Sequence, residues 1–533
     1  MPLTPRRIRK PMPLRGYRPS WPADNIGQDY TPNCRNVRFT FGKVRDAPGR
    51  DILTGPVSNE TVRSISQFAR IDGITIWPML LTDTKLFRWG DTSPGNPPQW
   101  HQVQGDVVLS GTRIYTTAVG EDHFFFCNGN TQICQWDGNA PNSHFNIIPV
   151  SDGGVLPKAR FIEYFNNRIT GAFCTEGSNT FANRIRWAQN GDFTKWNDTN
   201  GLGAGFLDLS DERQEPIRGI RTLGGEMAIY TRHSIKHMIP TGTLDPTYIV
   251  VTRYRGTGCD APYTIASAGQ MHFYLGYDHN VWMWDGINAT PVGFPVWEQI
   301  DALVTPQNMD TYFGMVSTNR GEYWLVIGTD VFVYDYQRQA WSRDSFPNLT
   351  ALGEVEKQLP GYVWLNLAPP PPGIPGIWSV QTQTWEELRQ PVITTLFGGR
   401  VDGATMIVDD TVTYDYFAIG SIVDRFMETE DMYIGYGEKS DPDPMAVGTI
   451  LRMLLVYNFI TTDPFEVGIS VDRGMSWQTQ LVTPNQLGQS LIDWNVTGET
   501  VRFRFREDNV NGQFRWSSYE YEWTPGGDYI GTV

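Results

Sequence analysis

Short apolar runs separated by turn residues dominate the chain, and they predict strands. Val, Ile, Tyr, Phe and Trp gather in runs that are bounded by Gly, Asn, Asp or Pro. Such runs, about four to eight residues long, are typical of β-strands. Stretches with the 3.6-residue spacing of a helix are almost absent. The pattern therefore predicts a protein that is mostly β.

One phrase recurs within these runs: an apolar or aromatic pair followed by an acidic residue or glycine at a turn. Neighbouring copies are 43 to 54 residues apart, and their aromatic anchors are Trp89, Trp136, Trp187, Tyr230, Trp284, Tyr334 and Trp378. Four strands with their turns need roughly 40–50 residues, the length of one propeller blade. The repeat predicts a β-propeller of six to seven blades. Generic hairpins in a sandwich are the alternative.

The pattern changes along the chain and suggests four parts. The repeat fades after about Arg400, and a second set of alternating strands begins after Gly448. We expect a basic, proline-rich arm in 1–32, the propeller in 33–398, an acidic connecting segment in 399–447, and a small β-sandwich in 448–533. Pro369 to Pro372 predict a stiff loop protruding from one blade.

Alternation also predicts how two C-terminal strands pair. Apolar residues alternate with arginine in 501–506 and with glutamate in 517–523. Apolar faces must meet, so a hairpin between them needs a register in which the paired positions sum to 1024. The pairs expected in this register are Val501–Trp523, Phe503–Tyr521, Phe505–Tyr519, Arg502–Glu522 and Arg504–Glu520.

Composition narrows the class of protein. The 533 residues include 27 Phe, 23 Tyr and 19 Trp, and only 19% are charged, which excludes disordered, collagen-like and coiled-coil chains. No apolar stretch approaches the ~20 residues of a membrane-spanning helix. The five cysteines lack a C-x-x-C pair and are expected to be buried thiols, with a Cys127–Cys134 disulfide as the alternative.

Charge is distributed unevenly over a chain with a net charge of −15. An acidic block runs from Asp402 to Asp443. It is expected at a channel lining or subunit surface, because unpaired carboxylates are costly to bury, and a merely solvated face is the alternative. Its candidate residues are Asp409, Asp410, Asp415, Glu428, Glu430 and Asp431. The N-terminal arm is expected to dock on an acidic neighbour or to stay disordered, through Arg6, Arg7, Arg9, Lys10, Arg15 and Arg18.

One motif has a defined local geometry. Residues 470–477 match an Asp-box, the pattern S-x-D-x-G-x-S/T-W, through Ser470, Asp472, Gly474 and Trp477. The motif predicts a hairpin turn and resembles the Asp-boxes of sialidase propellers, which carry several copies and an arginine cluster. A single copy outside the predicted propeller does not favour such an enzyme.

Other candidate chemistry is weak. His233 and His237 lie on predicted strands and lack the glutamate of a zinc-protease helix. No nucleophile–base pair presents itself, so we expect no catalytic residue, no metal and no cofactor.

One segment carries a family resemblance. Residues 33–49, NCRNVRFTFGKVRDAPG, resemble the N-x-R-N-V-R-F-x-x-G-K-V-x-x-x-P-G signature of short-tailed bacteriophage tail proteins, the nozzle, tail-tubular or DNA-stabilisation hub components. Residues 256–262, continuing to Val281-Trp-Met-Trp-Asp-Gly286, are similar to another recurrent stretch of that family. The resemblance covers roughly residues 25 to 390.

The resemblance implies a non-catalytic virion subunit assembled in the host cytoplasm. It implies a β-propeller and a homohexamer around the tail axis below the portal and adaptor proteins. Distal fibre or needle proteins would be further partners, and genomic double-stranded DNA would pass through the channel without sequence-specific binding. The alternatives are a carbohydrate-binding or carbohydrate-active propeller, receptor-binding or sialidase-like, and a soluble interaction scaffold.

Overall fold

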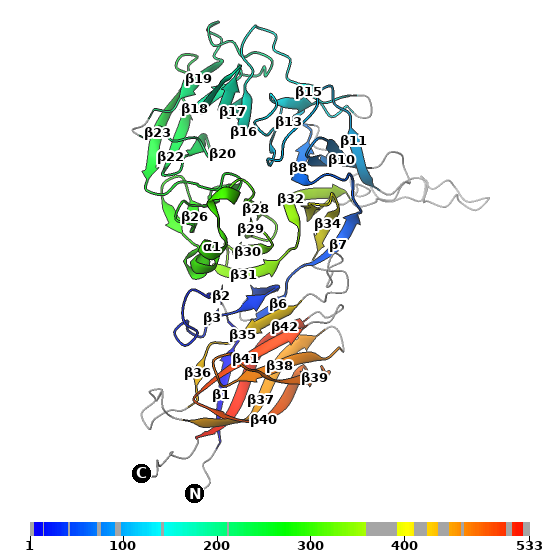
Figure 1. Ribbon diagram of the computed structural model, residues 1–533, viewed down its shortest axis with the longest axis vertical. Coiled ribbons are helices and arrows are strands. Elements are labelled where there is room, and N and C mark those ends of the chain that lie inside the picture. The colour runs from blue at the N-terminus through cyan, green and yellow to red at the C-terminus, as the bar shows by residue number, and fades with distance from the viewer. Residues whose placement is uncertain are drawn as a thin grey trace, which may run out of the picture.

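The computed structural model describes residues 5–13, 15–40, 43–71, 76–90, 98–139, 143–210, 213–358, 392–409, 424–434, 447–459, 463–507 and 514–525. These residues form a ring of small sheets above an elongated pair of sheets, a propeller and a sandwich (Figure 1). The fold is all-β, as the strand pattern predicts.

Seven four-stranded antiparallel units make up the propeller in the described part of the chain. Each of the first six blades is continuous in sequence, and blade 6 carries two further strands at its edge. From the first blade to the seventh the strands are β8 (Val62–Ala69), β9 (Ile76–Thr82), β10 (Leu86–Gly90) and β11 (Gln99–Val103); β12 (Thr116–Gly120), β13 (His123–Cys127), β14 (Cys134–Trp136) and β15 (Asn146–Ile147); β16 (Lys158–Phe165), β17 (Arg168–Glu176), β18 (Asn179–Trp187) and β19 (Gly205–Asp208); β20 (Gly219–Leu223), β21 (Glu226–Tyr230), β22 (Ser234–Pro240) and β23 (Tyr248–Arg255); β24 (Ala266–Ser267), β25 (His272–Leu275), β26 (Val281–Trp284) and β27 (Ala289–Pro291); β28 (Phe313–Ser317), β29 (Glu322–Ile327), β30 (Asp330–Asp335) and β31 (Ala340–Ser345); and β32 (Leu349–Gln358), β33 (Val392–Arg400), β34 (Thr405–Asp409) and β7 (Gly49–Thr54).

The seventh blade joins the two ends of the ring. Its outer strand, β7, comes from the N-terminal part of the chain and pairs antiparallel with β34. The chain continues from β7 into β8 of blade 1, so the main-chain hydrogen bonds between β7 and β34 anchor the segment that leads into blade 1 on blade 7. The propeller consequently begins at residue 49 in this closing strand and ends at residue 409.

The sandwich consists of two sheets, and both draw on the N-terminal region. One has the order β40 (Gln489–Gly498), β37 (Gly448–Phe459), β42 (Phe514–Pro525), β6 (Lys43–Asp46) and β5 (Val37–Thr40), with β1 (Arg6–Pro11) also paired to β42. The other has the order β39 (Gln478–Val482), β38 (Phe465–Ser470), β41 (Thr500–Glu507), β35 (Arg425–Glu428) and β4 (Cys34–Arg35), with β36 (Met432–Tyr433) also paired to β41. The sandwich is thus larger than 448–533 and is built from both ends of the chain.

The expected hairpin between 501–506 and 517–523 is wrong. β41 and β42 belong to different sheets, so no paired register exists between them. The apolar faces do meet, but across the sandwich: the Phe503 and Tyr519 rings have centroids 5.6 Å apart, and those of Phe505 and Tyr519 are 5.7 Å apart. Alternation fixes which face of a strand is apolar, and a partner in the facing sheet buries that face as well as a partner in the same sheet.

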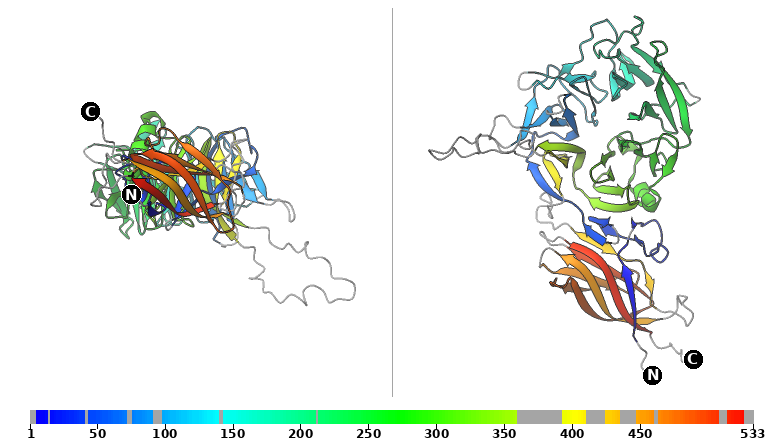
Figure 2. Two further views of the ribbon diagram at one scale, coloured as in Figure 1. Left: turned by 90° about the horizontal axis from the view of Figure 1, so that it is seen from below. Right: turned by 180° about the vertical axis from the view of Figure 1, so that it is seen from behind.

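The remaining N-terminal strands lie against the propeller. β2 (Gly16–Tyr17) and β3 (Tyr30–Thr31) extend blade 6 in parallel beyond β31. Between blades 5 and 6 lie η1 (Phe294–Val296), α1 (Trp297–Leu303) and η2 (Pro306–Asn308), and buried Ile300 of α1 joins the apolar cluster that continues into the sandwich. Views from below and behind show the sandwich at one rim of the ring (Figure 2).

Candidate functional site

A central cavity lies where the inner strands of the seven blades converge. Its volume is about 430 Å³, and residues of β8, β12, β16, β20, β24, β28 and β32 line it. The inner strand of every blade contributes, so the cavity is the axial opening of the propeller.

The charged groups that line this cavity have hydrogen-bond partners. Arg221 donates to Glu163 across 3.2 Å, and the Thr222 main-chain N–H donates to the same carboxylate across 3.1 Å. Glu354 accepts from the Ser317 hydroxyl at 2.7 Å. The described lining includes neither histidine nor cysteine. The opening is therefore a space with polar groups along its lining.

A second site is the junction of the two bodies, centred on Arg38 of β5. The Arg38 guanidinium donates twice to Asp344 of β31, at 2.9 and 2.6 Å, and once to Glu322 of β29, at 3.2 Å. The three side chains are only 5%, 1% and 6% exposed. A fork-to-fork pair of this kind fixes orientation as well as charge. It fastens a sandwich strand to blade 6.

Asn36 adds a main-chain connection at the same place. Its N–H donates to the Arg343 carbonyl at 2.9 Å, and its side-chain oxygen accepts from the Ser345 N–H at 3.2 Å. Its side-chain amide donates to the Asp424 carbonyl at 3.0 Å. Asn36 has a φ of 53°, a left-handed conformation that asparagine tolerates better than most residues. Asn36 and Arg38, two buried residues of the segment with the family resemblance, therefore join the sandwich to the propeller.

Sequence reasoning did not find this joint. Arg38 stands between apolar Val37 and Phe39 at a strand position, which is a weak sign of an unusual environment. Its carboxylate partners lie 284 and 306 residues away and carry no signal in sequence spacing.

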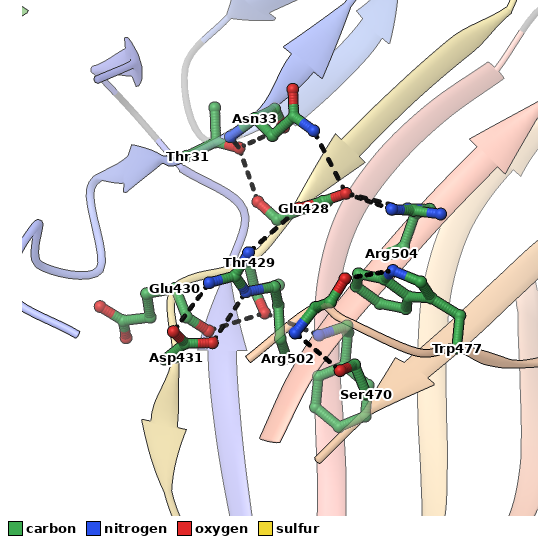
Figure 3. Close-up of polar contacts among 12 residues, drawn as sticks. Thr31, Asn33, Glu428, Thr429, Glu430, Asp431, Ser470, Trp477, Arg502 and Arg504 are labelled. Atoms are coloured by element: carbon green, nitrogen blue, oxygen red, sulfur yellow. Dashed lines mark hydrogen bonds and ion pairs between the residues drawn. The ribbon is translucent and has the colours of Figure 1, made fainter. Parts of the chain in front are cut away.

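Two residues of the acidic block are buried, although the expectation was that its carboxylates lie at a surface or channel lining. Glu428 and Asp431 are 3% and 7% exposed, so they are neither solvated nor available to line a channel. Arg504 donates to Glu428 at 2.6 Å, and Arg502 donates to both oxygens of Asp431 at 2.7 Å (Figure 3). Burial is tolerated here because β41 supplies an arginine at alternate positions, which the expectation of unpaired carboxylates left out.

The other acidic candidates have different surroundings. Glu430 accepts from the Lys10 ammonium at 3.1 Å, which ties the acidic block to β1 of the same chain. Asp409 ends β34 opposite Gly49 and is half-buried. Asp410 and Asp415 lie outside the described residues, as do Trp378 and the proline run at 369–372.

The Asp-box forms the turn between β38 and β39. The Asp472 carboxylate accepts from the Ser470 hydroxyl at 2.7 Å and the Ser476 N–H at 2.9 Å, and Gly474 has a φ of +86°. A hydrogen bond from the Ser476 hydroxyl, together with these two, lowers the Asp472 pKa to about 2. The Trp477 indole N–H donates to the Gly474 carbonyl, and the Arg504 guanidinium lies 4.0 Å from the ring centroid of this indole. The turn therefore packs on Arg504, which forms the ion pair with Glu428 (Figure 3).

The basic arm is part of the fold over most of its described length. Residues 6–11 pair antiparallel with β42 over the whole of β1. Arg7 lies within 3.7 Å of Glu522, and the Arg9 guanidinium donates to the Ser518 hydroxyl at 3.4 Å. The expectation of a docking or disordered arm is wrong here because an open strand edge of β42 offers main-chain partners that proline-poor residues 6–10 can take. Arg6 lies over the Trp523 ring.

Arg15 and Arg18, the last two of the six candidate basic residues, contact aromatic residues of the same N-terminal region. The Arg18 guanidinium lies over the rings of Trp21 and Tyr30, at 3.9 and 4.8 Å from their centroids. The pKa of Arg15 is raised by a hydrogen bond to Tyr30. These contacts are within one chain, as are those of Arg6, whose guanidinium lies 5.7 Å from the Trp523 ring centroid.

His233 and His237 are hydrogen-bonded to carboxylates, and the cysteines are buried. His237 of β22 bonds to Glu226 at 2.6 Å and accepts from the Trp284 indole at 3.1 Å, and His233 bonds to Glu215. No cluster of three or more potential metal ligands occurs among the described residues. All five cysteines are buried and free, and burial raises the pKa of Cys127 and Cys134 to about 12.

Comparisons with solved structures found chains that are similar to this one at TM-scores below 0.5. No family model and no curated protein matches it. The WD40 domain of Pan2 from Neurospora crassa is 8% identical over 68% of this chain and 94% of that chain, with a TM-score of 0.36. YCF48 bound to D1 peptide is 12% identical over 68% and 94%, with a TM-score of 0.35. The extracellular domain of BT4673 from B. thetaiotaomicron is 9% identical over 88% and 58%, with a TM-score of 0.39.

At these identities the likeness concerns the fold alone. The described residues also contain no helix with the length and apolar character needed to cross a bilayer.

Proposed function

We propose that this protein is a structural subunit of the tail of a short-tailed bacteriophage. In this role it is a nozzle or hub component, forming a six-membered ring below the portal and adaptor proteins. The ring retains the packaged genome and conducts it during ejection. Its partners in this role are the portal and adaptor proteins, and its location is the virion.

The observation that carries the proposal is the place of residues 33–49. This segment bears the resemblance to the tail proteins, and its Asn36 and Arg38 form the buried joint between propeller and sandwich. The resemblance therefore rests on residues that hold the two-body architecture together, rather than on an exposed turn that many β proteins could share. A subunit that transmits load along a tail needs such a rigid joint.

Charge is compatible with a conduit for DNA. Duplex DNA carries one negative charge per ~1.7 Å of its axis, and a basic lining would hold it by releasing counterions. A chain with a net charge of −15 has no overall attraction for DNA, which favours sliding over retention.

Deletion of the gene from the phage genome that carries it tests the proposal. Heads should still fill, but they should lack the distal tail and lose DNA, measured as nuclease-sensitive DNA in the purified particles. Supplying the wild-type chain from a plasmid should restore infectivity. Particles with complete tails and protected DNA would contradict the proposal, and particles that fail only to adsorb to cells would favour a receptor-binding propeller.

A further inference from the structure

Exposed aromatic side chains gather in one region of the propeller. Five aromatic side chains are exposed in the part of the chain that the structure describes. Four of them, between 38% and 64% exposed, belong to three short segments: Trp21, Tyr277, Phe294 and Trp297. The fifth, Phe206, lies on β19 of blade 3. We call the region of the four side chains the aromatic surface, and nothing in the proposed tail role assigns it.

Hydrogen bonds hold the three segments against one another. The Ser20 N–H and hydroxyl donate to the Pro295 carbonyl at 3.4 and 3.0 Å. The Ser20 hydroxyl also accepts from the Glu298 N–H at 3.4 Å, and the Trp297 indole N–H donates to the Asp278 carbonyl at 2.9 Å. The segment after β2 therefore lies beside η1 and α1, and α1 lies beside the loop between β25 and β26 (Figure 1).

A group of exposed aromatic side chains is typical of a binding surface. Single exposed apolar residues are ordinary on protein surfaces, whereas contiguous apolar patches mark sites of interaction. Tryptophan and tyrosine, together with arginine, are enriched among the residues that dominate protein–protein binding energy. The aromatic surface thus has the composition of a protein-binding site, and its charge indicates which kind of partner fits.

The aromatic surface lies in an acidic part of the chain. Residues 256–319 contain six carboxylates and no lysine or arginine. Glu298 and Asp301 of α1 are exposed, one and four positions after Trp297. Asp301 bonds to His279 at 2.7 Å, whereas the Glu298 carboxylate has no ion-pair or hydrogen-bond partner among the described residues. These charges repel a polyanion such as nucleic acid or an anionic membrane, and they attract a cation.

Arg18 of the same chain shows how a cation packs on this surface. Its guanidinium lies 3.9 Å from the Trp21 ring centroid and 4.8 Å from that of Tyr30. A cation over an aromatic ring is attracted by the negative face of the ring. Phe294 and Trp297 have no such cation among the described residues, and both are exposed. Their rings can therefore take a cation from another molecule.

We propose that the aromatic surface docks a partner protein through arginine or lysine side chains of that partner. The partner's cations lie over Phe294 and Trp297 and pair with the Glu298 carboxylate. Arginine suits both contacts, because its planar guanidinium stacks on an aromatic face and pairs with a carboxylate through two N–H groups. This inference does not depend on the tail role.

Binding of a fluorescein-labelled oligoarginine peptide to the purified full-length chain, measured by fluorescence anisotropy, tests the proposal. The test variant is Phe294→Ser with Glu298→Gln. The matched control, Phe206→Ser with Glu499→Gln, removes one exposed ring and one exposed carboxylate elsewhere. We expect at least about fivefold weaker binding in the test variant and an unchanged affinity in the control. Phe294→Leu keeps an apolar side chain and the wild-type melting temperature, but it should also weaken binding, because the aromatic face is lost.

Other occupants give different results in the same set of variants. No peptide binding by the wild type up to about 1 mM, or equal binding by the test and control variants, would overturn the proposal. Binding of oligothymidylate or of phosphatidylglycerol vesicles that the test variant loses would overturn it as well, because both probes are anionic. Self-association of the wild type that the test variant lacks would assign the surface to a second copy of this chain and would also overturn the proposal.

Discussion

Replacing Arg38 by methionine should loosen the joint between propeller and sandwich. The guanidinium satisfies Asp344 twice and Glu322 once, and both carboxylates are almost fully buried. Methionine fills much of the same volume but leaves the two carboxylates without their cation. The Trp324 indole still donates to Glu322 at 3.0 Å, so part of that charge stays hydrogen-bonded.

The loss of unfolding free energy in Arg38→Met is large because the ion pair is buried. Breaking a buried ion pair by removing one partner costs about 3–5 kcal/mol, because an uncompensated charge stays behind. Removing the charge as well, in Arg38→Met with Asp344→Leu, should recover part of this loss, since buried pairs can often be replaced by apolar residues. The double variant should therefore be more stable than Arg38→Met alone.

Equilibrium unfolding in urea, followed by tryptophan fluorescence, measures these differences. Arg7→Met is the control, because Arg7 is 66% exposed and its ion pairs to Glu520 and Glu522 span 4.0 and 3.7 Å. An exposed pair of this kind contributes about 0–1 kcal/mol. A loss of less than about 1 kcal/mol for Arg38→Met would refute the claim that this ion pair fastens the joint.

Three further predictions concern single positions. His272 is buried, and desolvation lowers its pKa to about 4. In the unfolded chain the histidine has a pKa near 6.5 and is protonated first, so stability falls as pH falls from about 6.5 to about 4. His272→Gln should remove up to about 1.4 kcal/mol per pH unit of that slope, measured by urea unfolding at several pH values. Gly16→Ala places a Cβ 2.2 Å from the Trp341 carbonyl oxygen, whereas Gly27 has a similar φ and its Cβ would meet nothing within 4 Å. Gly16→Ala should therefore lower the melting temperature clearly more than Gly27→Ala. Equal effects would show that the backbone angle φ, and not the close contact, determines the loss of stability. Glu428→Gln should cost about 1.5–3 kcal/mol of unfolding free energy, because the charge-assisted bonds to β41 are lost, and an effect near zero would mean that the buried cluster is not stabilising.

Much of the fold could be predicted from the sequence, because blade repetition leaves a local signal. Trp89, Trp136, Trp187, Trp284 and Tyr334 each lie on the third strand of a blade. Tyr230 lies instead on the second strand of blade 4, so the aromatic phrase marks apolar strands without fixing their place in the blade.

Strand exchange between distant segments could not be predicted. β7 completes a blade whose other strands lie about 300 residues later, and β1, β4, β5 and β6 enter the sandwich formed mainly by the C-terminal region. Alternation gives the apolar face of such strands but not their partners. The same limit explains why the Asp-box turn was visible in sequence, whereas the burial of Glu428 depended on arginines of β41 and was not.

Electron microscopy of the purified full-length protein tests the proposed tail role most directly. Two-dimensional class averages, recorded over a range of protein concentrations and with the adaptor protein added, should show rings of six subunits with the propeller and sandwich of each held in one fixed relation. Particles that stay single under all these conditions, or rings of another symmetry, would contradict the account.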